Sequence, residues 1–174
     1  QRSNLPAVCG RVCPHERQCE GSCILGRKGQ GIKIGKLERF IADMDGELEL
    51  VAPNVAKSQP GNIAVIGSGP AGLTVAGDLA KMGFKVTVFD SQPEAGGVLM
   101  YGIPEFRLPK QVVRREVKRI KKLGVDFKLN IMVGTEITVD ELFNQGFDAI
   151  FIGTGNALSK SLPIDGAKLK GVIQ

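Results

Sequence analysis

The sequence predicts an α/β fold with a parallel, doubly wound sheet, preceded by a smaller helical segment. Short apolar runs rich in β-branched residues alternate with helical patterns from residue 62 onward, which is typical of such a sheet. A cluster of glycines directly follows the first run, and all four cysteines lie in the first 30 residues. The chain therefore divides into a helical domain at 1–50, a linker at 51–61 and an α/β domain at 62–174.

Each expected element has its own local signal. The first helix of the α/β domain starts at Pro70, whose missing N–H suits a first helical turn. Thr138 and Glu141 have the spacing of a capping box and open a short helix. The expected elements are a helix at 32–45, strands at 63–66 and 85–89, a helix at 110–122, a strand at 125–129, a helix from 138 and a strand at 147–152. Residues 1–30 and 91–108 are expected to be irregular, and a long irregular segment inside a domain is usually functional.

The segment 67–72 has the pattern G-x-G-x-x-G between a strand and a helix. Gly67 permits the tight turn, Gly69 lets the backbone approach a pyrophosphate, and Gly72 lets the helix pack on the strand. Asp90 ends the next strand, 18 residues after Gly72, where a ribose-binding carboxylate is expected. The combination predicts dinucleotide binding; the alternative is a glycine-rich turn that binds nothing.

The net charge of +5 has a local source, because residues 110–122 hold seven basic side chains and one acid, Glu116. Val113, Val117 and Ile120 share one face of this helix, so the basic side chains are expected on its solvated face. A docking face for an acidic partner is the alternative. Nucleic acid is not an expected ligand, since the chain has no Trp and one Tyr to stack on bases.

No apolar run approaches the roughly 20 residues that span a bilayer, and the first residues do not resemble a signal peptide. We therefore expect a cytoplasmic protein that does not contact a membrane. Because the chain begins with Gln1 rather than Met, we expect it to be a piece of a longer protein.

The cysteines have the spacing C-x3-C-x5-C-x3-C, with Pro14 directly after Cys13. Iron–sulfur ligation tolerates such spacing and often places Pro after a ligand. Zinc usually has a longer stretch between its cysteine pairs, and free or disulfide-bonded thiols are the third possibility. His15 is expected to be a solvated loop residue rather than a ligand. No cysteine follows Cys23, so the redox cysteine pair of flavin disulfide reductases is absent from this sequence.

Several segments together resemble the small (β) subunit family of NADPH-dependent glutamate synthase. They are residues 9–23, 34–43, 67–73, 96–98 and 101–109. The string Gly-Ile-Pro-x-Phe-Arg-Leu-Pro at 102–109 is far more specific than the glycine pattern. The same motifs occur in the large subunit of the electron-bifurcating ferredoxin:NADP oxidoreductase, in sulfide dehydrogenase and in the N-terminal half of dihydropyrimidine dehydrogenase.

The resemblance implies that the α/β domain is a Rossmann-like FAD-binding domain. The pyrophosphate would lie on 67–72, the ribose at Asp90 and the adenine at Val133, with Gly96 and Gly97 on the flavin side. The residues that it assigns to FAD are Gly67, Ser68, Gly69, Pro70, Ala71, Gly72, Asp90, Ser91, Gln92, Gly96, Gly97, Val98, Arg107, Val133, Gly153, Thr154 and Gly155. No catalytic side chain is expected, because the flavin carries the chemistry.

The resemblance also implies two 4Fe-4S clusters in the N-terminal domain. Cys13, Cys19 and Glu38 match ligands of one cluster, and Cys23 matches a ligand of the other. The family's remaining ligands lie upstream of Gln1, and its NADPH-binding domain lies further along the chain. We therefore expect no intact clusters in residues 1–30, and a segment that is mobile or held by an adventitious metal, a disulfide or a neighbouring chain.

The function implied is that of an oxidoreductase passing electrons from NADPH through FAD and 4Fe-4S clusters to a partner, most simply the large glutamate synthase subunit, for glutamate synthesis from glutamine and 2-oxoglutarate. A ferredoxin:NADP oxidoreductase or sulfide dehydrogenase subunit, with another electron-accepting partner, is the alternative. From another class, the chain could be a non-catalytic dinucleotide-binding module with a zinc-stapled N-terminus. The piece by itself is expected to be inactive.

Overall fold

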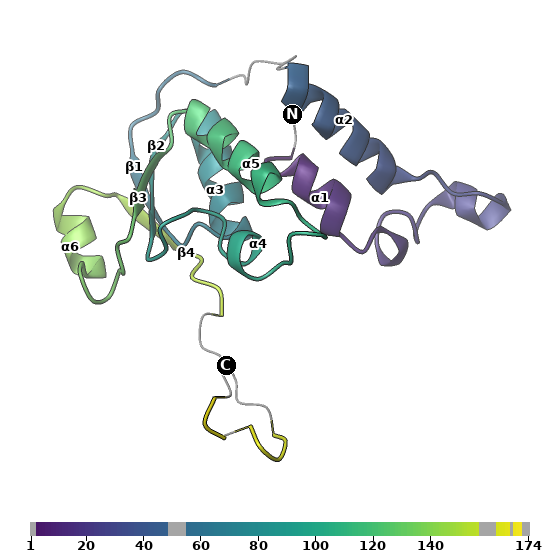
Figure 1. The fold of residues 1–174 in the computed structure, drawn as a ribbon. Helices are drawn as coiled ribbons and strands as arrows, with labels where there is room; N and C mark the ends of the chain where they lie inside the picture. Colours follow the sequence, from purple (N-terminus) through teal and green to yellow (C-terminus); the bar gives the residue numbers. More distant parts are fainter. Residues whose placement is uncertain (1–2, 49–54, 157–162, 168, 172–174) are drawn as a thin grey trace.

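The computed structural model describes residues 3–48, 55–156, 163–167 and 169–171 (Figure 1). Residues 51–54 of the expected linker lie outside the described residues. The elements are α1 (Pro6–Val12), the short 3-10 helices η1 (His15–Arg17) and η2 (Ile24–Lys28), α2 (Ile34–Leu48), β1 (Asn62–Ile66), α3 (Pro70–Lys81), β2 (Lys85–Asp90), α4 (Val98–Tyr101), α5 (Lys110–Lys122), β3 (Asp126–Leu129), α6 (Val139–Asn144) and β4 (Ala149–Ile152).

The four strands form one parallel sheet in the order β3-β2-β1-β4, which confirms the predicted fold class. In the centre, Ile63 of β1 pairs with Val86 of β2 on one side and with Ala149 of β4 on the other. Strand β1 has protein on both faces, so it is an almost continuous apolar run, as buried parallel strands usually are.

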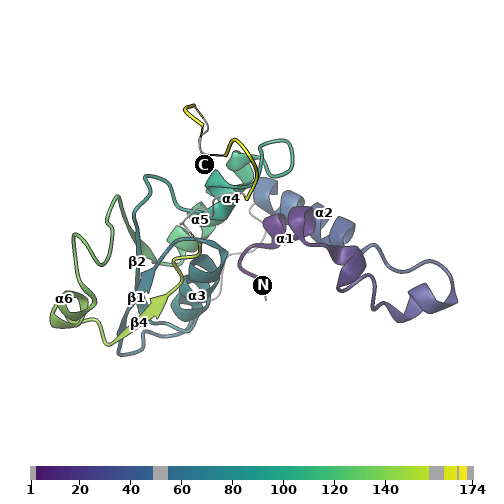
Figure 2. The ribbon, with the colours of Figure 1, turned by 90° about the horizontal axis from the view of Figure 1, so that it is seen from below.

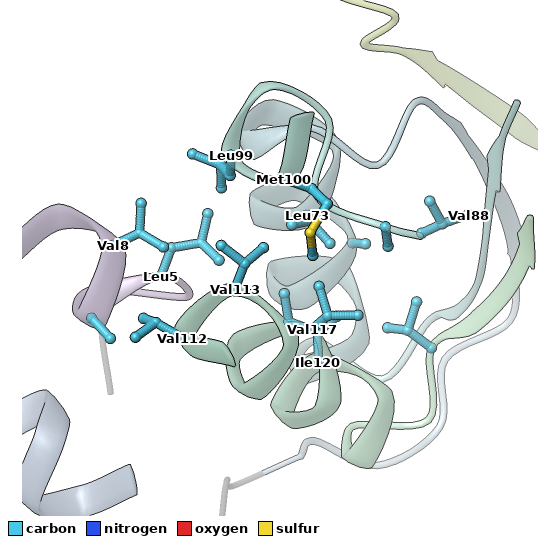
Figure 3. Close-up of a cluster of buried hydrophobic side chains, with 14 of the residues drawn as sticks. Leu5, Val8, Leu73, Val88, Leu99, Met100, Val112, Val113, Val117 and Ile120 are labelled. Carbon is cyan, nitrogen blue, oxygen red and sulfur yellow. The ribbon is translucent and has the colours of Figure 1, made fainter. Parts of the chain in front are cut away.

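Helices α3 and α5 cover one face of the sheet, and α6 lies at the other (Figures 1 and 2). The larger core lies beneath α3 and α5, where Leu73, Val88, Val113 and Ile120 are almost completely buried (Figure 3). On the opposite face, the rings of Phe89 and Phe147 meet edge to face, with centroids 5.7 Å apart. Val88 and Phe89 are neighbours in β2 and serve opposite cores, as the alternation of side chains along a strand requires.

The expectation of an irregular N-terminus is wrong for Pro6–Val12, which form helix α1. Pro6 lies in its first turn, and Leu5 and Val8 reach the core beside Val112 and Val113 of α5 (Figure 3). The burial of these side chains against a distant helix stabilises a turn that local propensity does not predict. The second irregular stretch, 91–108, also contains the short helix α4.

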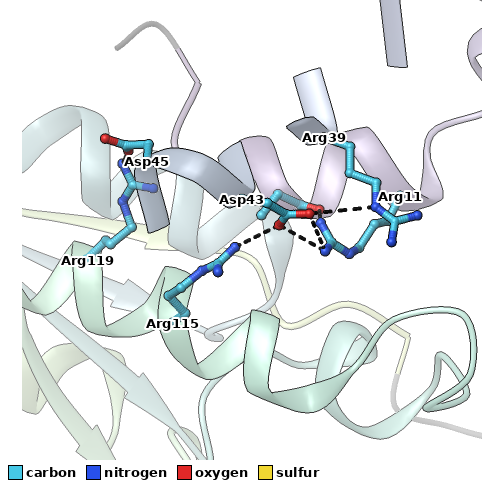
Figure 4. A network of polar contacts seen from close by, with 7 residues as sticks. Arg11, Arg39, Asp43, Asp45, Arg115 and Arg119 are labelled. Carbon is cyan, nitrogen blue, oxygen red and sulfur yellow. Dashed lines mark hydrogen bonds and ion pairs between the residues drawn. The ribbon is translucent and has the colours of Figure 1, made fainter. Parts of the chain in front are cut away.

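The basic face of α5 is not simply solvated, which corrects the main interpretation of its charges. Arg115 contacts Asp43 and Arg119 contacts Asp45, and both acids belong to α2 (Figure 4). The acidic partner of these two arginines is therefore a helix of the same chain. Glu116, between them in sequence, is fully buried.

The longest helix of the described residues, α2, has 15 residues, and none there combines the length and apolar character needed to cross a bilayer.

Candidate dinucleotide-binding site

The glycine motif, the predicted ribose acid and the glycines after the last strand meet at the carboxyl edge of the sheet. Gly67 follows β1, Asp90 ends β2 and Gly153 follows β4. The backbone N–H of Gly67 donates to the carbonyl of Phe89, and that of Gly153 donates to the carbonyl of Ile66. Ligands of open α/β sheets bind at this edge, so the topology supports the predicted position of the site.

Gly67 and Gly72 are required by close packing. Gly67 has φ of +98°, and a Cβ there would lie 2.3 Å from the carbonyl oxygen of Gly153. A Cβ on Gly72 would lie 1.9 Å from the carbonyl oxygen of Gly67. These two positions keep β1, α3 and the end of β4 in contact, and any side chain at either would push them apart.

Gly69 is different, because a Cβ placed there meets no described atom within 4 Å. Its φ of −68° suits any L residue, so the fold itself tolerates a side chain at this position. Gly69 is the N-cap of the 12-residue helix α3 and makes no side-chain capping hydrogen bond, so the N–H groups of the first turn lack a capping side chain beside this open space. Such a helix end attracts a phosphate, so this cradle is the candidate position for the pyrophosphate of a dinucleotide.

Gly97 packs against Gly69 and forms a wall beside this cradle. It has φ of +53°, and a Cβ on Gly97 would lie 2.8 Å from the Cα atom of Gly69. Gly96 and Gly97 therefore bring the segment after β2 directly against the glycine turn. The family resemblance placed these glycines on the flavin side and did not predict this contact.

The Asp90 carboxylate is held by the protein itself. Oδ2 accepts hydrogen bonds from the backbone N–H of Ser68 at 2.7 Å and from its hydroxyl at 2.5 Å, while Oδ1 accepts from the N–H of Gln92 at 2.9 Å. Ser68 is fully buried, and its Oγ also accepts from the N–H of Gly96 at 3.1 Å. Ser68 thus joins the glycine turn, Asp90 and the Gly96–Gly97 wall, a connecting role for which the sequence offered no signal.

The remaining predicted FAD residues lie in less enclosed positions. Val98 is the half-exposed first residue of α4, and Thr154 and Gly155 are exposed after β4. Val133 is partly buried after β3 and bridges to Ile137. Arg107 lies on an exposed turn that its N–H closes onto the carbonyl of Pro104. Pro70, Ala71, Ser91 and Gln92 belong to the glycine turn and to the segment after β2.

Cys9 lies within α1, and the other three cysteines lie in the segment from the end of α1 to the start of η2, which extends away from the sheet (Figure 2); all four are free thiols. Burial, together with neighbouring Cys13 and Glu38, raises the pKa of Cys9 to about 11. Backbone hydrogen bonds, first with Ile32, lower the pKa of Cys23, and Cys19 is exposed.

The prediction that His15 is a solvated loop residue is wrong, because its side chain is largely enclosed. A Cβ on Gly35 would overlap its ring, and its Nε2 lies 4.0 Å from Oε2 of Glu38. Within the described parts of the chain, no three His, Cys, Asp or Glu side chains gather around a point that could hold a metal. The described residues therefore do not by themselves form a complete cluster site.

Family models match both parts of the chain. Residues 1–50 match the model described as dihydropyrimidine dehydrogenase domain II, 4Fe-4S cluster, and residues 61–174 match that of pyridine nucleotide-disulphide oxidoreductase. FprA from Mycobacterium tuberculosis (His57Gln mutant) is a similar solved structure, with a TM-score of 0.56 and 25% identity over 66% of this chain and 27% of that one.

Curated relatives confirm the resemblance seen in the sequence. The glutamate synthase [NADPH] small chain of Escherichia coli is 41% identical over 99% of this chain and 36% of its own length, and that of Bacillus subtilis is 42% identical over 98% and 34%. The putative oxidoreductase UacF of Escherichia coli is 44% identical over 100% of this chain and 27% of its own. The chain thus spans well under half the length of these relatives. Because one model matches more than half of it, the chain belongs to the pyridine nucleotide-disulphide oxidoreductase family.

Proposed function

We propose that this chain binds FAD at the carboxyl edge of its sheet and forms the flavin-binding part of an oxidoreductase. The observation that carries the proposal is the open cradle above Gly69, which lies between the first turn of α3 and the Gly97 wall. Of the three motif glycines, Gly69 is the one that the fold itself does not require, and a bound pyrophosphate gives a reason for its presence.

The bound flavin supplies the redox chemistry, accepting a hydride and releasing electrons. The chain's own residues bind and orient it. Backbone N–H groups at the start of α3 hold the pyrophosphate, and the lone pairs of Asp90 that Ser68 and Gln92 leave open accept from the ribose hydroxyls. Val133 contacts the adenine, and Gly97 and Val98 line the flavin side.

We propose further that the electrons come from NADPH and pass to a partner subunit for glutamate synthesis from glutamine and 2-oxoglutarate. The names of two relatives, glutamate synthase [NADPH] small chain, support this choice. In this proposal Cys13, Cys19, Cys23 and Glu38 become cluster ligands together with ligands from beyond residues 1–174. The match of residues 1–50 to a 4Fe-4S domain supports that role.

The substitution Gly69→Val tests the FAD site. The valine fits the φ of this position and enters open space, so the fold should persist while FAD affinity falls by at least about tenfold through overlap with the pyrophosphate. FAD titration followed by flavin fluorescence, with a thermal melt, measures both effects. Met82→Val, at the exposed C-terminal end of the same helix, is the matched control. Full FAD occupancy in Gly69→Val would reject the proposed placement.

A further inference from the structure

Lys110 connects the start of α5 to the end of α4. Its Nζ donates to the carbonyl of Leu99 at 2.9 Å and also to the carbonyl of Ile103. The last carbonyls of a helix have no partner within that helix, and a cation near them is favourable. The Lys110 ammonium therefore closes the end of α4 and fixes the turn that follows it.

Further hydrogen bonds hold the residues around α4 and the turn that follows it against α5. The Glu105 carboxylate accepts from the backbone N–H of Lys110 at 3.1 Å. The Tyr101 hydroxyl accepts from the N–H of Glu94 at 3.0 Å, and the Glu94 carboxylate binds the Arg114 guanidinium at 2.7 Å. The hydrogen bonds of Tyr101 and Arg114 are exposed to solvent, whereas those of the Lys110 ammonium are partly buried. Lys110 is thus the most enclosed of these supports.

What Lys110 fixes is the wall of the candidate FAD site. Helix α4 begins at Val98, directly after Gly97, and the N–H groups of Met100 and Tyr101 donate to the carbonyl of Gly97. Gly97 in turn packs against Gly69. A shift at the end of α4 would therefore move the Gly97 wall relative to the glycine turn.

We propose that Lys110 is a positioning residue for the flavin half of the bound cofactor. The inference rests on the proposed FAD site. It gives a physical role to the most specific string of the sequence, at 102–109, which forms the turn between the two helices that Lys110 joins. On the adenosine side, Asp90 is held by Ser68 and Gln92, and Val133 bridges to Ile137. Asp90 is linked to the Gly97 wall only through Ser68 and the N–H of Gly96, so the adenosine half of the site should depend on Lys110 less than the flavin half does.

The test compares FAD with ADP, which has the adenosine and pyrophosphate but lacks the flavin. We expect Lys110→Met to weaken FAD binding by roughly tenfold, since two hydrogen bonds from a charged donor are lost. ADP affinity should fall by a clearly smaller factor than FAD affinity, because only the pyrophosphate of ADP would lie next to the Gly97 wall, and the absorption spectrum of bound flavin should change as its surroundings loosen. Lys110→Arg keeps a cation that can donate to two carbonyls and should restore most of the FAD affinity.

Lys118→Met is the matched control, because Lys118 is an exposed residue of the same helix. Equal loss of FAD and ADP affinity in Lys110→Met, or no loss of either, would overturn the positioning role. If Lys110→Met does not fold, Lys110→Gln and Lys110→Arg carry the same comparison, and equal FAD affinities in these two would reject the need for a cation. A parent chain that binds ADP but not FAD, or neither, overturns the proposed function and this inference with it.

Discussion

Asp43 on α2 and Arg115 on α5 form an ion pair with a 3.1 Å separation between Oδ1 and Nη2 (Figure 4). The same carboxylate accepts two bonds from Arg11 of α1, at 2.9 and 2.8 Å, and lies 3.7 Å from Arg39. One acid therefore joins both N-terminal helices to the helix layer of the sheet domain. Together with the Arg119–Asp45 contact and the buried Leu5 and Val8, the pair holds the N-terminal helices against the sheet domain.

Replacing Asp43 should destabilise this junction. Asp43→Asn removes the charge that Arg11 and Arg115 share, leaving partly buried guanidinium groups without compensation, and we expect a loss of about 1–3 kcal/mol in the free energy of unfolding. Urea denaturation followed by circular dichroism measures it. Asp165→Asn, at an exposed site, is the control. Equal stability of the two variants would show that the ion pairs contribute little.

Glu116 should make the chain less stable as the pH rises. Burial raises the pKa of this carboxyl above its ordinary value of 4.5, and the nearby Arg119 and Arg115 only partly oppose the shift. The folded state thus holds its proton at a higher pH than the unfolded state. This contribution is fully present below pH 4.5 and is lost as the pH rises through the folded-state pKa.

The substitution Glu116→Gln tests this sign. The neutral amide keeps the shape without the ionisation, so its stability relative to the parent chain should increase from pH 4 toward neutral pH. Denaturant midpoints across that range give the difference. Asp43 contributes in the opposite direction, because hydrogen bonds and charges from Arg11 and Arg115 lower its pKa despite partial burial, so its stabilisation is lost at low pH. A constant difference between Glu116→Gln and the parent would contradict the assignment to Glu116.

Replacing Ser68 with alanine should lower both the stability of the chain and its affinity for FAD. Ser68→Ala removes the hydroxyl that binds Asp90 and Gly96, and leaves a partly buried carboxylate oxygen and a buried N–H with fewer partners. We expect a loss of about 1–2 kcal/mol in stability and a weaker affinity for FAD. Thermal melts and FAD titration test both, with the exposed Ser58→Ala as control. An unchanged FAD affinity would limit Ser68 to a structural role.

The cysteines should not hold two complete clusters in this chain. The family pattern supplies three ligands for one cluster and one for the other, and the described residues do not gather three ligands at one point. Anaerobic reconstitution, followed by iron analysis and electron paramagnetic resonance, measures the occupancy. Iron equivalent to two full 4Fe-4S clusters per chain would show that the assigned ligand set is wrong.

Elements with strong local signals were predictable from the sequence. A few adjacent residues are enough to predict strand β1, which leads into Gly67, and the start of α3 at Pro70. The capping box is formed as expected, with the N–H of Glu141 donating to Thr138 Oγ1 at 3.2 Å and the N–H of Thr138 donating to Glu141 Oε2 at 2.7 Å. Each of these signals needs only neighbouring residues, so the chain specifies it before the fold is complete.

The sequence by itself thus determined the parallel sheet, the glycine turn and the identity of the acid that ends β2. Only the tertiary structure decided what these residues contact: Asp90 accepts from Ser68, Arg115 pairs with Asp43, and Lys110 closes α4. The first two contacts join residues 22 and 72 positions apart. Helical periodicity shows which residues share a face but not which element covers that face, and this is why periodicity alone predicts a solvated basic side for α5.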